Sequence, residues 1–178
     1  DSAVIRYARA RASLMRCAVW DGERAVQTLE KLRREAAARQ ERVLAARLLV
    51  IIGRGQLGLG HNAQGLQALQ QAVSELRAVG DDKGLATALY AYSYGLILDS
   101  HRPSEALPYI NELLVHASRH NMPDRKLQAL RLYDEWRESI EEVDDYFGRA
   151  RNRLQYFPPA LGIPEDADLV AFADGVVS

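Results

Sequence analysis

Apolar residues recur along the chain with the 3.6-residue period of an α-helix, and short polar stretches rich in glycine, proline, asparagine and aspartate interrupt them. This pattern predicts helices of roughly fifteen to eighteen residues. The expected helices cover about 3–19, 23–39, 41–59, 62–79, 83–99, a segment that follows Pro103 and ends before Asn121, 125–141 and 144–156. Asn62 is expected to cap the fourth helix, which Gly80 ends. The acidic Asp81 and Asp82 then open the fifth.

One helix-opening pattern occurs three times. Each occurrence has a turn, then a small residue that begins an apolar helix, and then an aliphatic residue four positions later. The pairs are Ala25/Leu29, Gly65/Leu69 and Ala106/Ile110, so the pattern returns at a nearly constant interval along the chain. A fixed period of roughly forty residues is typical of helical solenoids, in which each unit buries its apolar face by stacking on the next. We therefore expect an all-α, right-handed α-solenoid of three to four helix hairpins over residues 1–157.

The helical pattern stops at Phe157-Pro158-Pro159. Residues 158–178 contain a glycine, a further proline and several acids, and they predict a loop followed by a short terminal helix. Such a segment can cap the last unit, fold back into the groove or link to another domain, and capping is the role that we prefer. The expected division is a helical repeat domain over 1–157 and a C-terminal tail over 158–178.

Two of the expected hairpins begin with the same arrangement of side chains, in which a large apolar residue is followed three positions later by another and then by a small residue. The residues are Leu49, Ile52 and Gly53 in one hairpin and Leu89, Tyr92 and Ser93 in the next. This order resembles the tetratricopeptide repeat (TPR) family in a long-repeat variety, with units of roughly forty residues. The resemblance covers about residues 5–157. Gln56 departs from it, because the family has an aromatic or aliphatic residue there.

A second, weaker resemblance concerns the long Ala- and Leu-rich helices from Arg42 to Leu76. The length and composition of these helices are similar to those of the superhelical sensor region of bacterial transcription regulators related to the maltose activator. In such regulators this region receives a small molecule or a regulatory protein, and a separate helix-turn-helix binds DNA. The sequence shows no convincing DNA-binding helix pair of that kind.

In TPR arrays the first helix of each pair lines an inner groove, and the resemblance places seven residues there. They are Arg47, Val50, Arg54, Leu57, Tyr90, Tyr94 and Ile97. Arginines offer forked donors to carboxylates or phosphates, and tyrosines offer a large contact area with little entropy to lose. This set suits an acidic peptide or an anionic small ligand. The alternative is that the tyrosines pack between helices and the arginines only extend along the surface.

The net charge of the chain excludes some classes of binding partner. The net charge of −1 and the pI of about 6.5 argue against direct nucleic-acid binding and against attraction to anionic membranes. Basic residues dominate 1–54 and acidic residues dominate 134–178, which permits head-to-tail association into a homo-oligomer, although we prefer local pairing on solvated helix faces.

The single Cys17 excludes an intramolecular disulfide and suits a reducing, cytoplasmic location. The apolar runs are too short to span a bilayer.

The sequence has no catalytic motif. It contains no G-x-S-x-G and no phosphate-binding loop. The glycine run from Gly53 to Gly60 lies at a helix end, where glycines either permit close helix packing or loosen the helix end, and it does not predict a dinucleotide site. His116 and His120 have the i,i+4 spacing of zinc ligands, but no third ligand lies nearby in the sequence. We therefore expect no enzyme activity, no cofactor and no metal.

The expected function is that of a non-catalytic scaffold or adaptor module that binds a protein or peptide, acidic in character, in the concave groove of a TPR superhelix. The alternative is a ligand- or regulator-sensing domain of a bacterial transcription regulator with a small-molecule effector. A flanking DNA-binding domain in the parent gene would favour this alternative.

Overall fold

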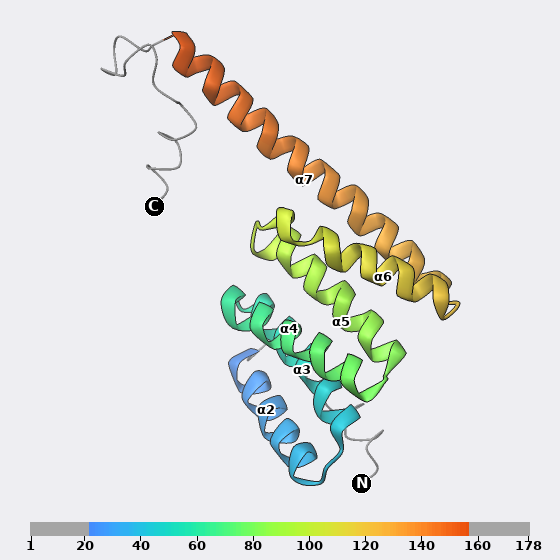
Figure 1. The fold of residues 1–178 in the computed structure, drawn as a ribbon. Helices are drawn as coiled ribbons and strands as arrows, with labels where there is room; N and C mark the ends of the chain where they lie inside the picture. The colour runs from blue at the N-terminus through green and yellow to red at the C-terminus, as the bar shows by residue number, and fades with distance from the viewer. Residues whose placement is uncertain (1–21, 157–178) are drawn as a thin grey trace. The chain divides into compact units, whose positions relative to one another are not determined.

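The computed structural model describes residues 22–156, and within them the side chains of 22–140 (Figure 1). This part of the chain contains helices and no strand. The helices are α2 (Gly22–Ala38), α3 (Arg42–Gly58), α4 (Asn62–Val79), α5 (Asp82–Tyr94), the π-helix η1 (Gly95–Asp99), the 3-10 helix η2 (Pro103–Glu105), α6 (Leu107–Arg119) and α7 (Pro123–Tyr156). The expected helix over 3–19 and the tail over 158–178 lie outside the described residues.

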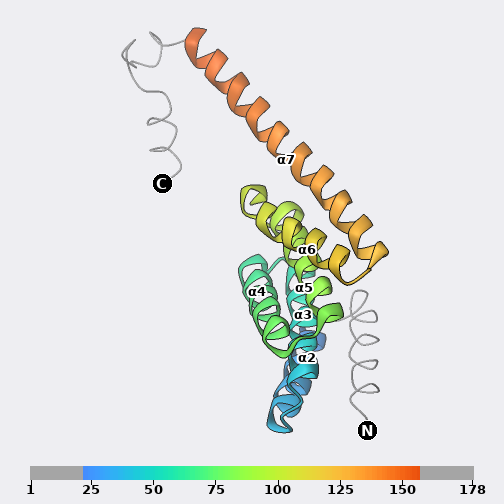
Figure 2. The same cartoon turned by 45° about the vertical axis from the view of Figure 1, so that its right-hand side comes forward.

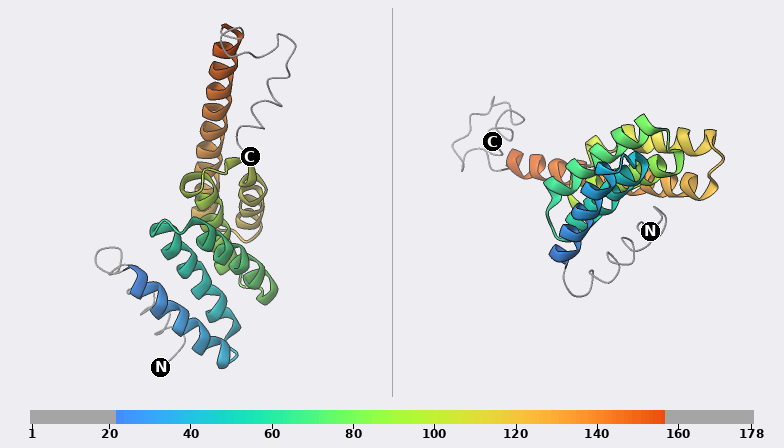
Figure 3. Two further views of the ribbon diagram at one scale, coloured as in Figure 1. Left: turned by 90° about the vertical axis from the view of Figure 1, so that its left-hand side faces the viewer. Right: turned by 90° about the horizontal axis from the view of Figure 1, so that it is seen from below.

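The successive α-helices from α2 to α6 pack on one another, and α3 also contacts α5 (Figures 2 and 3). The chain divides into two compact units, 1–137 and 138–178, and α7 begins in the first unit. Ala129 and Leu132, on the first turns of α7, join the same buried cluster as the apolar residues of α5 and α6. No helix within residues 22–156 is long and apolar enough to cross a lipid bilayer.

The small and aliphatic residues that repeat in the sequence form the core. All three pairs, Ala25/Leu29, Gly65/Leu69 and Ala106/Ile110, are buried. The largest fully buried side chains are Leu29, Leu48, Leu69, Leu76, Leu89, Leu96, Ile110, Leu113 and Leu132. These leucines and the isoleucine come from every α-helix from α2 to α7 and from η1, so the repeating pattern marks the faces on which successive helices pack.

Helices α3 and α4 cross at two glycines. A Cβ atom on Gly53 would lie 2.9 Å from the carbonyl oxygen of Gly65, and a Cβ atom on Gly65 would lie 2.9 Å from the carbonyl oxygen of Gly53. The same added atoms would lie 2.6 Å from Cγ of Leu69 and 2.7 Å from Cγ of Leu57. The two backbones therefore approach more closely than any side chain allows. This confirms that glycine at position 53 permits close helix packing.

The turn residues set most helix ends as expected. Gly80 ends α4 in the left-handed conformation with φ of 70°. Asp81 caps α5, and its side chain accepts a hydrogen bond from the backbone N–H of Gly84. The expected cap at Asn62 is wrong, because the N-cap of α4 is His61 and makes no side-chain cap bond. The Asn62 amide instead donates to the carbonyl oxygen of Asp99 at the end of η1.

The fifth helix ends at Asp99 as expected, although its last residues form the π-helix η1. One further expectation about helix ends is wrong. The expected break between 141 and 144 is absent, since α7 runs without interruption from Pro123 to Tyr156. The residues between the two expected helices, Glu142 and Val143, include neither glycine nor proline, so nothing in them forces the backbone out of a helix.

The close crossing of α3 and α4 predicts that two glycine-to-alanine substitutions in α3 change the free energy of unfolding in opposite directions. We expect Gly53→Ala to lower the free energy of unfolding by about 1–3 kcal/mol, because the new methyl group overpacks the crossing. Gly58→Ala is the matched control, since an added Cβ meets nothing within 4 Å there. It should stabilise the protein by up to about 1 kcal/mol through helix propensity. Urea unfolding followed by circular dichroism measures both, and equal shifts for the two variants would contradict the close crossing.

Candidate functional site

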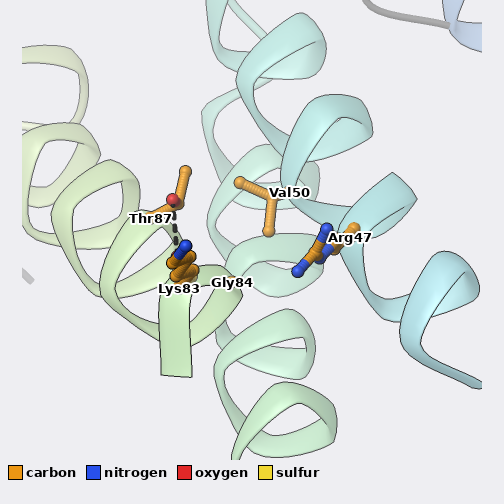
Figure 4. A pocket seen from close by; sticks show the side chains of 5 residues that line it. All are labelled: Arg47, Val50, Lys83, Gly84 and Thr87. Carbon is orange, nitrogen blue, oxygen red and sulfur yellow. Dashed lines mark hydrogen bonds between the residues drawn. The ribbon is translucent and has the colours of Figure 1, made fainter. Parts of the chain in front are cut away.

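A surface pocket of about 180 Å³ lies between α3 and α5 (Figure 4). Its lining residues are Arg47 and Val50 from α3, and Lys83, Gly84 and Thr87 from α5. The pocket is placed by the packing of α3 against α5 and by the start of α5 just after the Gly80 turn. Two of the seven predicted groove residues, Arg47 and Val50, are therefore brought together here.

Arg47 is held in a fixed orientation at this pocket. Its Nε donates to Oδ2 of Asp81 at 2.5 Å and its Nη2 donates to Oδ1 at 2.7 Å. Such a forked pair fixes the plane of the guanidinium as well as its position. The Asp81 side chain is only 9% exposed, whereas that of Arg47 is 36% exposed. Asp81 therefore serves two purposes, because the same carboxylate also caps α5 through the N–H of Gly84.

The Arg47 hydrogen bond lowers the pKa of Asp81 below its ordinary value of 3.8. Burial acts in the opposite direction, and the hydrogen bond from the N–H of Gly84 adds to the lowering. The carboxylate is therefore ionised at neutral pH, and it neutralises one positive charge at the edge of the pocket.

Two further cations, Lys83 and Arg125, lie at or beside the same pocket. Arg125, at the start of α7, donates from Nη2 to Oγ1 of Thr87 at 2.9 Å and from Nη1 to Oε1 of Gln128 at 2.7 Å. Both acceptors are neutral. Among the described residues, no ion pair involves Lys83 or Arg125. Among the described residues, Asp81 is the carboxylate that pairs with one of the three cations around Thr87, so we expect the pocket to attract negative charge.

The other predicted groove residues divide into two groups. Tyr94 is 39% exposed, Tyr90 is partly buried, and their ring centroids lie 6.1 Å apart. Arg54 is exposed on α3, and it takes part in no ion pair in the described part of the chain. By contrast, Leu57 and Ile97 are 8% and 2% exposed and belong to the core.

The placement of Leu57 and Ile97 in the groove is therefore corrected. Ten positions along an α-helix correspond to a rotation of about 80° from the starting direction, so Leu57 turns away from the face of Arg47. Its side chain instead fills the space beside Gly65 and Gly95. Ile97 lies in η1, where the wider π-turn changes the helical register that the sequence pattern assumes.

Lys83, Thr87 and Arg125 were not predicted from the sequence, although the repeat period points to two of them. Arg47, Thr87 and Arg125 follow one another at nearly the interval that separates the repeated helix openings. These three positions are therefore equivalent in α3, α5 and α7 if the repeat period holds throughout. A search for polar residues at that spacing would have found Thr87 and Arg125. Lys83 precedes Thr87 by one helical turn and has no such signal.

A second pocket, of about 480 Å³, lies among α2, α3 and α4. Its lining residues are Glu30, Arg33, Arg34, Leu49, Ile52, Gln56, Gln64, Gln67, Ala68 and Gln71. Four glutamines give this pocket many hydrogen-bonding groups, and Glu30, Arg33 and Arg34 add charges of both signs. Arg33 is paired with Glu75 at 3.2 Å.

Comparisons of the chain with protein-family models, with curated proteins and with solved structures find no match. The likeness to TPR proteins therefore rests on the residue pattern alone. Any assignment of function depends on the geometry and charge of the two pockets.

The Arg47–Asp81 pair predicts a specific pH dependence of stability. Because the native pKa of Asp81 is lowered, the stabilisation by its ionised form is present above 3.8 and is lost as the pH falls through the lowered native value. We expect Asp81→Asn to reduce the free energy of unfolding at pH 7 by about 1 kcal/mol. The difference from the native chain should disappear in acid. Urea unfolding between pH 2.5 and 7 measures it, and a difference independent of pH would contradict the ion pair.

Proposed function

We propose that the chain is a non-catalytic binding module that holds an acidic segment of a partner protein against the face formed by α3, α5 and the start of α7. The observation that carries the proposal is the cluster of cations around Thr87, in which Lys83 and Arg125 pair with no carboxylate of the described residues. A carboxylate from a partner is the group that this cluster lacks. It would accept hydrogen bonds from Lys83 and Arg125 while Asp81 keeps Arg47 oriented.

The cationic pocket continues into an aromatic strip along the same helices. Lys83, Thr87, Tyr90 and Tyr94 follow one another at i, i+4, i+7 and i+11, which is one face of α5. Arg54 occupies the position on α3 that corresponds to Tyr94 on α5, since the two are one repeat period apart. A peptide that combines acidic and apolar residues matches this sequence of surfaces. The exposed ring of Tyr94 would provide contact area, and the cations would provide the charge complementarity.

A right-handed solenoid of TPR-like hairpins is the architecture that we propose for the repeat domain. Three observations support it: the repeat pairs are buried, successive α-helices from α2 to α6 pack on one another, and α3 also contacts α5. In such an architecture the first helices of successive hairpins form one continuous surface. The positions 47, 87 and 125 would then lie in a row, which agrees with the hydrogen bond between Arg125 and Thr87.

A specific observation also favours the alternative of a ligand-sensing domain. The glutamine-lined pocket of about 480 Å³ among α2, α3 and α4 falls in the size range of small-molecule sites, whereas the cationic pocket of about 180 Å³ holds only a small group. A polar effector would hydrogen-bond to the amides there. Binding of a metabolite that Gln67→Leu abolishes would support this alternative.

The proposal is tested with fluorescent peptides that carry two adjacent glutamates in otherwise varied sequences, and with matched peptides that carry glutamines. We expect the glutamate peptides to bind more tightly and Lys83→Glu to weaken them by at least about tenfold, because a repulsive charge replaces an attractive one. Fluorescence anisotropy at fixed salt measures the affinities. The affinity should also fall as salt is added.

The matched control is Lys31→Glu, which makes the same change in net charge on α2, a helix that does not line the pocket. This variant should bind the glutamate peptides as the native chain does. Equal affinity for glutamate and glutamine peptides, or equal weakening by the two lysine variants, would contradict a carboxylate-binding pocket.

A further inference from the structure

Three side chains that commonly bind metal ions converge where the C-terminal end of α6 meets the N-terminal end of α5. They are Asp82 in the first turn of α5, His116 in the last turn of α6, and His120 at its C-cap. Nε2 of His116 lies 3.7 Å from Oδ1 of Asp82, and Nδ1 of His120 lies 3.2 Å from Oδ2 of Asp82. One atom from each residue lies within 4.8 Å of the others.

The local fold explains why these groups meet. His116 and His120 are four positions apart on α6, so both rings project from one face, and their centroids are 4.4 Å apart. The packing of α6 on α5 then brings Asp82, which is distant from His116 in the sequence, to the same place. The sequence alone has no third ligand near the two histidines, and the fold supplies it.

We propose that Asp82, His116 and His120 form a binding site for a divalent transition-metal ion of the zinc type. Tetrahedral zinc holds nitrogen and carboxylate oxygen at about 2.0–2.2 Å, which places neighbouring ligand atoms about 3.3–3.5 Å apart. Nε2 of His116 lies 3.7 Å from Oδ1 of Asp82, and Nδ1 of His120 lies 3.2 Å from Oδ2, so each histidine is close to that distance from one of the two carboxylate oxygens. Two imidazoles and one carboxylate favour zinc over calcium or magnesium, which take mostly oxygen ligands.

The exposure of the three residues fits three protein ligands and one open position. The side chain of His116 is 12% exposed, that of His120 is 33% exposed, and that of Asp82 is 47% exposed. His116 forms the buried side of the site, and the other two residues border solvent, where water takes the fourth position.

A metal ion at this site would replace a hydrogen bond that His116 makes to the backbone. Its Nε2 lies 3.1 Å from the backbone carbonyl oxygen of Asp82, so a proton on this nitrogen donates to that carbonyl in the metal-free chain. Metal binding requires a neutral imidazole nitrogen and displaces this proton. The metal would then connect the ends of α5 and α6 more firmly than the hydrogen bond does. This site is separate from the proposed peptide surface and does not depend on it.

The test is calorimetric titration of the full chain, first treated with a chelator and then dialysed, with zinc chloride. We expect one ion per chain. His120→Ala and Asp82→Asn should each weaken the affinity at least about tenfold, because each removes a direct ligand. Cobalt(II) titration adds an independent readout, since tetrahedral coordination by these residues gives strong visible absorption that both variants should lose.

Two control variants each remove a side chain of a type that can bind zinc but that lies outside the proposed site. His101→Ala removes an exposed histidine in the segment before η2, and Cys17→Ser removes the single thiol of the chain. Both should bind zinc as the native chain does. Circular dichroism checks that every variant keeps its helix content. The proposal is overturned if the native chain binds no zinc, or if His120→Ala and Asp82→Asn bind it with native affinity.

Discussion

The close approach of α3 and α4 at Gly53 and Gly65 is the constraint on which the rest of the described structure depends. Because each glycine lies against the carbonyl oxygen of the other, Leu57 and Leu69 can wedge into the space beside the crossing. Leu57 then also contacts Gly95, where α5 passes into η1. A single point of backbone contact therefore fixes the pairing of α3 with α4 and the position of the helix that follows them.

That arrangement positions the candidate site through the turn between α4 and α5. Gly80 ends one helix, and Asp81 begins the next while it holds the guanidinium of Arg47 from α3. The same turn places Lys83 on the pocket and Asp82 against α6, where it faces two histidines. Three consecutive residues, 81 to 83, thus connect the helix cap, the proposed metal site and the proposed peptide surface. Each of these features uses a charged side chain at the start of α5, either the carboxylate of Asp81 or Asp82 or the ammonium group of Lys83.

The sequence predicted the features that depend on local chemistry. The ends of α4 and α5 follow from Gly80 and Asp81, and the core positions follow from the repeating small and aliphatic residues. Predictions from the sequence were wrong where a contact between residues distant in the sequence determines the local structure. The Asn62 amide, for example, donates a hydrogen bond to the carbonyl oxygen of Asp99 and does not cap its own helix. Leu57 was placed in the groove because a linear pattern does not follow the gradual rotation of a helix. Asp82 could not be joined to His116 and His120 before the packing of α5 on α6 was known.

The most direct measurement is a nuclear magnetic resonance titration of the isotope-labelled chain with a glutamate-containing peptide. If α3, α5 and the start of α7 form the binding face, the backbone amide signals that shift will be those around Arg47, Lys83, Thr87 and Arg125. The signals of the outer residues of α4 and α6 will stay in place. Shifts confined to α2 and α4, or no shift at any peptide concentration tested, would contradict a cationic peptide-binding face.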